Sequence, residues 1–362
     1  MSKLSKKKTK KKNLNEIFKK AEIFFQNIGH EDRLALIHDS DPDGVCSATV
    51  AIEALKRLGI SSVGIFARGP ESVKKSGILE NGFNKILVLD LAPHLYQKDL
   101  ERIKRMKKDV LIFDHHLTAK LGAKNIFYVN PRLAEKSLYL PTSYLIFKYF
   151  ESRTDISDME WIAAIGTVAD YGINPDTKDL IGKYVEMNRE RIWETEYGRA
   201  ASILNASTAI IGPEKTLKIL QHLKSFEQFK RVKAFTDSMR KFDTELKNRE
   251  NEVRGKIEFY PEKKLMISYV RTKYKHIASV ISSRISREKK NWTFILFEKR
   301  GDEYKLHGRS QAGRVSIGLL FSNLGVGGGH VQAGGGSIKV KNLEKFEKAL
   351  IREIGLIDRK KR

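Results

Sequence analysis

Three short apolar runs in the first third of the chain each lead into acidic residues. The runs are "LALIH", "KILVL" and "DVLIF", and the acids that follow them include Asp41, Asp90 and Asp114. Continuous stretches of Val, Ile and Leu without polar alternation are typical of strands buried on both faces, as in parallel sheets. A segment with helical spacing separates the first run from the strand-like "ISSVGIFA". This order predicts an α/β fold built on a parallel sheet.

A fourth apolar segment, "IGTVA", ends at Asp170, and we expect it to be a strand like the other three. Open parallel sheets bind their ligands at the carboxyl ends of the strands. The sequence therefore predicts that the acids at these four ends gather in one crevice: Asp41, Asp43, Asp90, Asp114 and Asp170.

Crowded carboxylates repel one another, and divalent cations are the usual remedy. Two adjacent histidines, His115 and His116, add imidazole nitrogens to the oxygen ligands. This donor set suits Mn²⁺ or Mg²⁺, and a pair of such ions serves phosphoryl hydrolysis. Each acid taken alone has another interpretation, as a helix cap or a turn residue, and this applies above all to Asp41 and Asp43.

The net charge of the chain indicates which kinds of partner it can bind. Its 362 residues carry a formal net charge of +24, with a pI near 9.8, and such a surface attracts nucleic acid. A lysine-rich surface of the thermophile kind is the alternative. The single cysteine, Cys46, excludes disulfides and fits a reducing compartment, so we expect a cytoplasmic protein. The apolar runs are too short to cross a membrane.

Charge and periodicity change four times along the chain, which predicts five segments. A lysine-rich start should be disordered, and the alternating strands and helices should form the first domain. Long amphipathic spacing follows and indicates a helical connector. A second, smaller α/β domain then contains "NLGVGGGHVQAGGGSIKV" and precedes a basic tail. The expected bounds are 1–20, 21–180, 181–255, 256–350 and 351–362.

Four motifs in this order, "DSDPDG", "LVLDLAP", "FDHH" and "TVADYG", resemble those of the DHH phosphoesterases. That family includes RecJ-type exonucleases, nanoRNases, cyclic-dinucleotide phosphodiesterases and family II inorganic pyrophosphatases. "VNPR", "GRS" and "GGGHVQAGG" are similar to further segments of the nuclease branch, and the wording resembles archaeal RecJ-like proteins. The resemblance implies a parallel-sheet DHH domain, joined by the helical connector to a smaller DHH-associated α/β domain.

The resemblance also implies a role for each motif residue, with two divalent ions, Mn²⁺ preferred and Mg²⁺ as the substitute. Asp41 would bind the first ion and Asp90 would bridge both. The second ion would be held by Asp43, His115 and Asp170. His116 would face the scissile phosphate, and Asp114 would orient the two histidines.

The first motif departs from the family pattern. Relatives often carry a histidine four residues before the first of these aspartates, and Ile37 stands there. His38, one position later, is a candidate ligand of the first ion, and Asp39 is another.

The glycine-dense segment has a chemistry of its own. Backbone amides at Gly328 and Gly329 can approach phosphate oxygens closely, and His330 and Arg309 can add charged hydrogen bonds. A flexible turn between two strands is the alternative. The resemblance adds Ser310 to the substrate-binding set and implies cleavage from a chain end.

Together these features predict a metal-dependent phosphodiesterase that releases mononucleotides from single-stranded DNA or RNA, with a lean toward 3′→5′ degradation. Its setting would be DNA repair, replication or RNA turnover, with partner proteins from those processes. One alternative is a small-substrate hydrolase of the nanoRNase, cyclic-dinucleotide or pyrophosphatase kind. A further alternative is a replication scaffold like Cdc45, although that branch typically loses motif acids that are present here.

Overall fold

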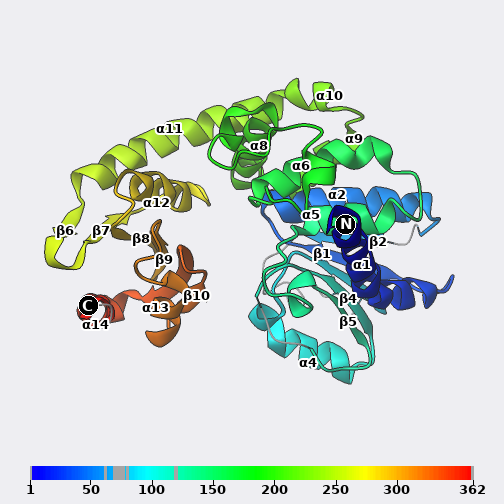
Figure 1. Cartoon of the computed structure of the whole chain (residues 1–362), viewed down its shortest axis with the longest axis horizontal. Helices are drawn as coiled ribbons and strands as arrows, with labels where there is room; N and C mark the ends of the chain where they lie inside the picture. The colour runs from blue at the N-terminus through cyan, green and yellow to red at the C-terminus, as the bar shows by residue number, and fades with distance from the viewer. Residues whose placement is uncertain (1, 61–62, 68–77, 79–80, 118–120, 360–362) are drawn as a thin grey trace. The chain divides into compact units, whose positions relative to one another are not determined.

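The computed structural model describes residues 2–60, 63–67, 78, 81–117 and 121–359. The chain divides into two compact units, Met1–Met239 and Arg240–Arg362, each with its own sheet (Figure 1). The division falls inside the long helix α11 (Lys233–Gly255). The predicted fold class, a parallel-sheet domain followed by a smaller domain with a second sheet, is confirmed.

The first unit is built on five parallel strands in the order β2-β1-β3-β4-β5. These are β1 (Leu34–His38), β2 (Val63–Ala67), β3 (Lys85–Leu89), β4 (Asp109–Phe113) and β5 (Ile126–Val129). Strands β1 and β3 are buried along their whole length, which explains their unbroken apolar sequences.

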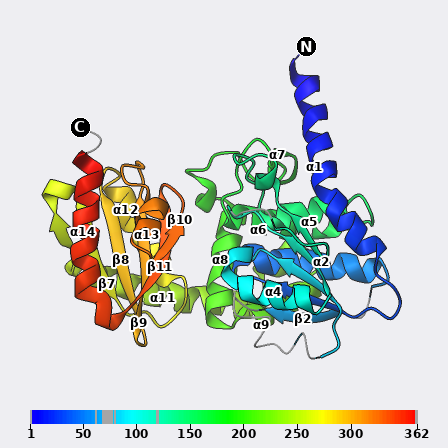
Figure 2. The same ribbon diagram turned by 90° about the horizontal axis from the view of Figure 1, so that it is seen from below.

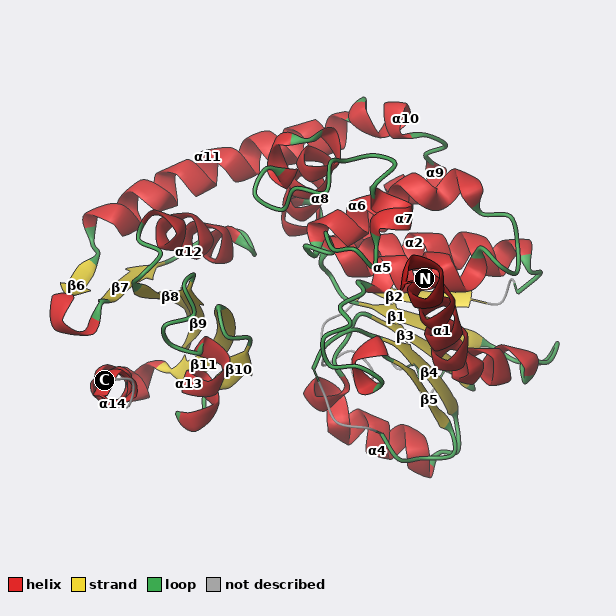
Figure 3. Ribbon diagram, in the orientation of Figure 1, coloured by secondary structure: helices red, strands yellow, loops and turns green. Residues whose placement is uncertain are grey.

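Helices cover both faces of this sheet, as the separation of red and yellow elements in Figure 3 shows. The helices of this unit are α1 (Ser2–Gln26), α2 (Pro42–Arg57), α4 (Gln97–Arg105), α5 (Thr142–Phe150), α6 (Glu160–Ala169), α7 (Lys178–Ile181), α8 (Glu196–Ile210), α9 (Pro213–His222) and α10 (Phe226–Lys230). Short 3₁₀ turns lie at Pro93–Tyr96, Pro131–Leu133, Ser157–Met159 and Ile192–Glu194.

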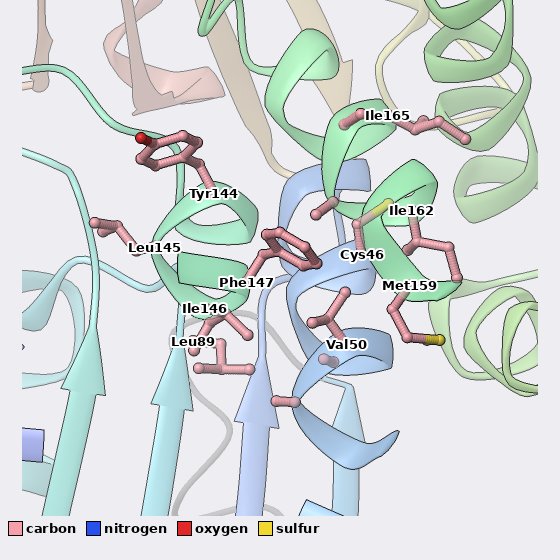
Figure 4. Close-up of a cluster of buried hydrophobic side chains, with 14 of the residues drawn as sticks. Cys46, Val50, Leu89, Tyr144, Leu145, Ile146, Phe147, Met159, Ile162 and Ile165 are labelled. Atoms are coloured by element: carbon pink, nitrogen blue, oxygen red, sulfur yellow. The ribbon is translucent and has the colours of Figure 1, made fainter. Parts of the chain in front are cut away.

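The larger core lies on the face covered by α1, α2, α5 and α6. Val50 of α2, Phe147 of α5, Ile162 of α6 and Leu89 of β3 belong to this one cluster, and Leu89 lies beside Ile146 of α5 (Figure 4). Cys46 is fully buried in the same cluster, which agrees with a structural thiol. The opposite face packs against Leu100 and other apolar residues of α4 in a smaller core.

The apolar segment before Asp170 is a helix, so the expectation of a fourth strand was wrong. Residues 161–168 of α6 are all buried, between α2, α5 and α8. A helix that is apolar on every side has no 3.6-residue periodicity to distinguish it from a buried strand. Asp170 is therefore the C-terminal cap of a helix and reaches the sheet edge from a different layer.

Helix α1 begins at Ser2, within the segment 1–20 for which the composition predicts disorder. Its last turns place Phe18, Ala21 and Phe24 at helical spacing, and all three are buried in the larger core. The ring of Phe24 lies 5.8 Å from that of Phe127 on β5. The lysine-rich composition of residues 1–20 concealed this apolar stripe, because its first residue, Phe18, lies near the end of that segment.

The second unit holds a six-stranded sheet in the order β10-β11-β9-β8-β7-β6, in which only β7 and β8 run parallel. The strands are β6 (Glu258–Tyr260), β7 (Leu265–Val270), β8 (Thr293–Arg300), β9 (Glu303–Ser310), β10 (Gly327–Gly329) and β11 (Ala333–Lys339). The helices are α12 (Ile277–Glu288), α13 (Ile317–Asn323) and α14 (Leu343–Arg359), with 3₁₀ turns at Pro261–Lys263 and Val340–Asn342.

Helices α13 and α14 cover one face of this second sheet, as Figure 2 shows. Phe321 of α13 and Leu350 of α14 pack there on Ile295 and Phe297 of β8. Helix α12 contacts β8 and β9 through a separate set of apolar side chains. Across the described residues, no helix combines the length and the apolar character needed to cross a membrane.

The burial of α1 predicts a test of the N-terminal segment. Phe24→Ala should lower the free energy of unfolding by about 3–5 kcal/mol, because it opens a cavity in the larger core. Ile23→Ala is the matched control, since Ile23 is 49% exposed and should cost less than about 1 kcal/mol. Urea denaturation measures both; equal stabilities of the two variants would contradict the packing of α1.

Candidate metal centre and substrate surface

Three acids form a row along the carboxyl edge of the parallel sheet. His38, Leu89 and Phe113 are in register on neighbouring strands, so Asp39, Asp90 and Asp114 are the next residues on β1, β3 and β4. The ladder extends one step beyond the strands, because the backbone N–H of Asp90 donates to the carbonyl of Phe113 at 2.9 Å. Adjacent parallel strands therefore bring these three residues to the same edge of the sheet, the position that the sequence predicted for Asp90 and Asp114.

The N-terminus of α5 holds two of the site's acids in place. Both carboxylate oxygens of Asp43 accept backbone N–H bonds, from Thr142 at 2.8 Å and from Ser143 at 3.0 Å. The hydroxyl of Thr142 donates to Asp90 at 2.9 Å. These contacts satisfy free amides at the start of a helix, where negative charge is favoured. Asp43 and Asp90 are nevertheless 1% and 2% exposed, so both charges are out of water.

His115 lies at the centre of the cluster. Its Nδ1 is 3.8 Å from Asp43 Oδ2 and 3.8 Å from Asp90 Oδ1, and its Nε2 is 3.2 Å from Asp170 Oδ2. Two groups of donor atoms within 4.8 Å of one another result, Asp43–His115–Asp170 and Asp90–His115–His116. Carboxylate oxygens with an imidazole nitrogen match the preferences of Mn²⁺ and Mg²⁺, so either group could hold such an ion.

The electrostatics of the cluster show uncompensated negative charge. Burial, followed by the charges of Asp170 and Asp41, raises the pKa of Asp43 well above its ordinary value. Burial, followed by Asp43 and Asp41, does the same to the pKa of Asp90. Burial and the neighbouring Asp41 raise the pKa of Asp39 to about 7. A bound divalent cation would remove this repulsion, so the residues fit the ions that the motifs predicted.

Asp41 and His38 lie outside both groups of close donors among the described residues. Asp41 is the N-cap of α2 and accepts the backbone N–H of Gly44 at 2.9 Å, as the capping alternative for this residue expected. His38 is fully buried; its Nδ1 lies 2.6 Å from the carbonyl of Asp39, and its Nε2 has no hydrogen-bond partner in the described part of the chain. Burial lowers the pKa of His38 to about 4, so its ring is neutral.

Asp114 is fully buried behind His116. Its Oδ1 accepts from His116 Nδ1 at 2.6 Å, and its Oδ2 accepts from the Tyr128 hydroxyl at 2.8 Å. The amide of Asn130 donates to the backbone carbonyl of His116 at 2.9 Å. Although burial lowers the pKa of His116, its bond to Asp114 outweighs this and raises that pKa to about 9. His116 is thus held as a charged, partly exposed proton donor at neutral pH.

Several residues of the centre escaped the sequence analysis. Tyr139 donates its hydroxyl to the backbone carbonyl of Asp170 at 2.8 Å and to the carboxylate of the same residue. Its ring centroid lies 5.1 Å from that of His115. Thr142 and Ser143 left a usable signal, because hydroxyl residues after Pro141 and before an apolar run are typical of a helix start. Tyr139 left no comparable signal.

The glycine-dense segment forms two paired strands of the second unit, β10 and β11. Gly329 has φ +143°, and a Cβ there would lie 2.5 Å from the carbonyl oxygen of Ala333, so the fold itself requires glycine. Gly328 is different, because a Cβ built there would meet nothing within 4 Å. Its cross-strand partner Gly335 is nearly as open. Packing within the fold therefore does not require glycine at either position. The two glycines leave the backbone there uncovered by side chains.

The other predicted substrate residues lie at the same end of β9. The guanidinium of Arg309 donates to the hydroxyls of Ser279 and Ser283 at 2.9 and 3.0 Å, which fixes it against α12. His330 is exposed, in the tight turn where its N–H donates to the carbonyl of Ala333. Ser310 is fully buried, and its hydroxyl accepts the N–H of Val315 at 3.3 Å. This contact gives Ser310 a structural role, and its part in substrate binding stays a prediction.

The two glycines should respond differently to substitution. Gly329→Ala should destabilise the second unit by about 1–3 kcal/mol, because alanine is strained at this φ and meets the backbone of β11. Gly328→Ala should leave the free energy of unfolding within about 0.5 kcal/mol of the wild type. We expect Gly328→Ala to weaken oligonucleotide binding instead, measured by fluorescence anisotropy. Unchanged binding by a folded Gly328→Ala protein would refute close ligand approach at this position.

The repulsion in the metal centre predicts a gain of stability on neutralisation. Asp90 has φ +62°, a conformation that asparagine adopts readily, so Asp90→Asn keeps the backbone while it removes one charge. Without metal, its melting temperature should rise by about 2–4 °C, which corresponds to about 1 kcal/mol. Added Mn²⁺ should stabilise the wild type more than this variant. Glu101→Gln on α4 is the exposed control; a lower melting temperature for Asp90→Asn alone would contradict the repulsion.

Comparison with known proteins adds to this geometry. The model of the DHH family, N-terminal domain, matches residues 33–172. No curated protein matches the sequence. Among solved structures, RecJ in complex with Mn²⁺ from Thermus thermophilus has 18% identity and a TM-score of 0.73 over 95% of this chain. The match covers 55% of the Thermus chain, so this chain spans little more than half of that protein.

Two further structures agree over nearly the whole of both chains. An exonuclease RecJ bound to manganese has 17% identity and a TM-score of 0.69, with 94% of each chain covered. The DHH domain of a member of the s1p family of ribosomal proteins has 16% identity and a TM-score of 0.71, covering 98% of this chain and 92% of that one. At these identities the likeness establishes the fold alone.

The same fold also occurs with other functions. A pGpG-specific phosphodiesterase from Vibrio cholerae matches at 14% identity and a TM-score of 0.52, over 90% of this chain and 99% of that one. CDC45 from Entamoeba histolytica matches at 12% identity and a TM-score of 0.53, over 96% and 99%. The fold therefore does not select the substrate. Residues 33–172, which include all the candidate metal ligands, match the model of the DHH family, N-terminal domain, and the chain shares its fold with RecJ.

Proposed function

We propose that this chain is a two-metal phosphodiesterase that removes mononucleotides from an end of single-stranded DNA or RNA, with degradation running 3′→5′. The observation that carries the proposal is the cluster around His115, where three carboxylates lie within 3.8 Å of one imidazole at the carboxyl edge of a parallel sheet. RecJ structures of the same fold contain Mn²⁺ or Mg²⁺, which supports such ions here.

The donor set divides into two sites in this proposal. Asp43, His115 and Asp170 would hold one ion, and Asp90 would be shared with the other. Asp41 and His38 would complete the first ion's shell, since the unpartnered Nε2 of His38 is a neutral imidazole nitrogen with a free lone pair. We propose Mn²⁺ as the preferred ion and Mg²⁺ as a substitute. When bound, the ions would lower the pKa of a water and offset charge on the phosphate.

The protein's own groups supply the remaining chemistry. His116 carries a proton at neutral pH and can donate it to the leaving oxygen of the phosphodiester. Asp114 fixes the orientation of that imidazole and stabilises its charge, while Tyr128 fixes Asp114. No side chain needs to form a covalent intermediate, because water is the nucleophile.

Substrate preference is inferred from charge and from the second unit. A net charge of +24 suits a polyanion better than a small phosphate ester, which favours a nucleic acid over pyrophosphate or a cyclic dinucleotide. Arg309, His330 and the bare backbone at Gly328 would hold the terminal nucleotide. Binding to an end, rather than along a strand, would make cleavage exonucleolytic.

A small-substrate hydrolase is the second candidate, because the pGpG-specific phosphodiesterase shares this fold. A scaffold without catalysis, of the kind that the CDC45 likeness suggests, is the third. The third is disfavoured by the acids themselves, since a scaffold has no use for buried carboxylates that repel one another.

A time course with 5′- and 3′-labelled single-stranded DNA and RNA in Mn²⁺ tests the proposal. Mononucleotides should appear from the first time point, and pyrophosphate and cyclic dinucleotides should be hydrolysed at least about 100-fold more slowly. Asp90→Asn should lose at least about 1,000-fold in kcat, because it removes a ligand shared by both ions.

Glu101→Gln, the exposed control on α4, should keep wild-type turnover. Faster hydrolysis of pyrophosphate or cyclic dinucleotides than of oligonucleotides would favour the second candidate, the small-substrate hydrolase, over the exonuclease. Intact, metal-loaded protein that hydrolyses none of these substrates would refute the enzyme altogether.

A further inference from the structure

Arg132 lies beside the candidate metal centre, next to Tyr139. It follows β5 in the short turn Pro131–Leu133, where the side chain of Asn130 accepts its backbone N–H at 2.9 Å. The same Asn130 donates to the backbone carbonyl of His116. The turn that carries Arg132 is therefore tied directly to the segment that carries the phosphate-facing histidine.

The guanidinium of Arg132 stacks over an aromatic ring of the site. Its central carbon is 4.9 Å from the ring centroid of Tyr139, and that ring lies 5.1 Å from the ring of His115. The hydroxyl of Tyr139 bonds to Asp170. Only the ring of Tyr139 thus separates the positive charge of Arg132 from the proposed metal ligand His115. A substrate group next to the one held at the metal centre could therefore reach the guanidinium.

Two donors of this guanidinium are not used within the described part of the protein. Nε and Nη1 are buried and have no hydrogen-bond acceptor, and Arg132 forms no ion pair with any described acid. Stacking does not account for this, because Arg153 also stacks on a tyrosine, Tyr149, and still pairs with Glu22 at 2.7 Å. Buried donors without acceptors are costly, so their persistence beside a site for an anion points to a ligand.

We propose that Arg132 binds a phosphate of the substrate, next to the phosphodiester held at the metal centre. A phosphate offers several acceptor oxygens to the planar donors of arginine, and the pairing is charge-assisted. The residue as a whole is only partly buried, so an anion can reach it from solvent. The assignment rests on the proposed function, because it requires a substrate with at least two linked phosphates.

The acids of the centre explain why such a residue is needed. Asp41, Asp43, Asp90 and Asp170 are within electrostatic reach of one another, and each repels an incoming phosphate chain. The four positive charges of two divalent ions would only balance the four carboxylates, so no net positive charge would remain to attract the anionic substrate. Arg132 supplies a permanent positive charge at the rim, and no carboxylate among the described residues neutralises it beforehand.

Phosphate binding tests this directly, with inorganic phosphate as the probe. The rise in melting temperature with phosphate concentration, in Mg²⁺, gives an apparent dissociation constant for the full chain. Arg132→Gln should weaken phosphate binding by about 10-fold or more. Arg132→Lys keeps the charge but not the planar donors, so its phosphate affinity should lie between those of the wild type and Arg132→Gln. Arg105→Gln, an exposed arginine on α4, should stay within about 2-fold of the wild type.

Kinetics provide the second readout. Arg132→Gln should lower kcat/KM on a single-stranded oligonucleotide by about 10- to 100-fold, mainly through KM. Without phosphate, its melting temperature should equal or exceed that of the wild type, because the unsatisfied donors are gone. A lower melting temperature together with unchanged phosphate affinity in the glutamine and lysine variants would make Arg132 a structural residue and overturn the proposal.

The two proposals fail separately. If the wild type hydrolyses no oligonucleotide, the proposed function is refuted, while the phosphate titration still decides whether Arg132 is an anion site. If oligonucleotides are hydrolysed and Arg132→Gln matches the wild type in both phosphate affinity and KM, the Arg132 site is refuted and the proposed function stands.

Discussion

Repulsion among buried carboxylates is the constraint that the rest of the first unit must offset. Parallel strands in register bring Asp39 and Asp90 to one edge, and α2 adds Asp43, which accepts hydrogen bonds from the start of α5. The chain tolerates this arrangement because the large core under α2, α5 and α6 stabilises the fold independently of the site. Repulsion at this edge of the sheet lowers the stability of the unit, and burial of the large apolar core offsets that cost.

The sequence was sufficient for the sheet and for the chemical character of the site. Continuous apolar runs predicted β1, β3 and β4, because strands buried on both faces have no polar alternation to confuse the pattern. The same lack of alternation misled for α6, whose buried surroundings erased its helical period. The buried stripe of α1 was missed because Phe18 and Phe24 adjoin a run of lysines that dominates the local composition.

What the sequence could not provide was the set of contacts between distant segments. Nothing near Tyr139 indicates that its hydroxyl would bond to Asp170, or that its ring would lie between His115 and Arg132. Ser310 shows the reverse case: a motif residue whose side chain points into the core of its own unit. Motifs predict the type of chemistry at a site, whereas the assignment of single residues requires the fold.

The edges of the second sheet have a consequence for how this protein behaves in a crowded solution. Both edge strands, β6 and β10, are only three residues long, and the longer strands lie between them. An exposed strand edge offers unpaired amides and carbonyls to other chains, and long apolar edges are where intermolecular sheets begin. An edge of three glycines has a low β-propensity and no side chains to bury against a second strand. The backbone of β10 can thus face solvent with little risk of recruiting another copy into an aggregate.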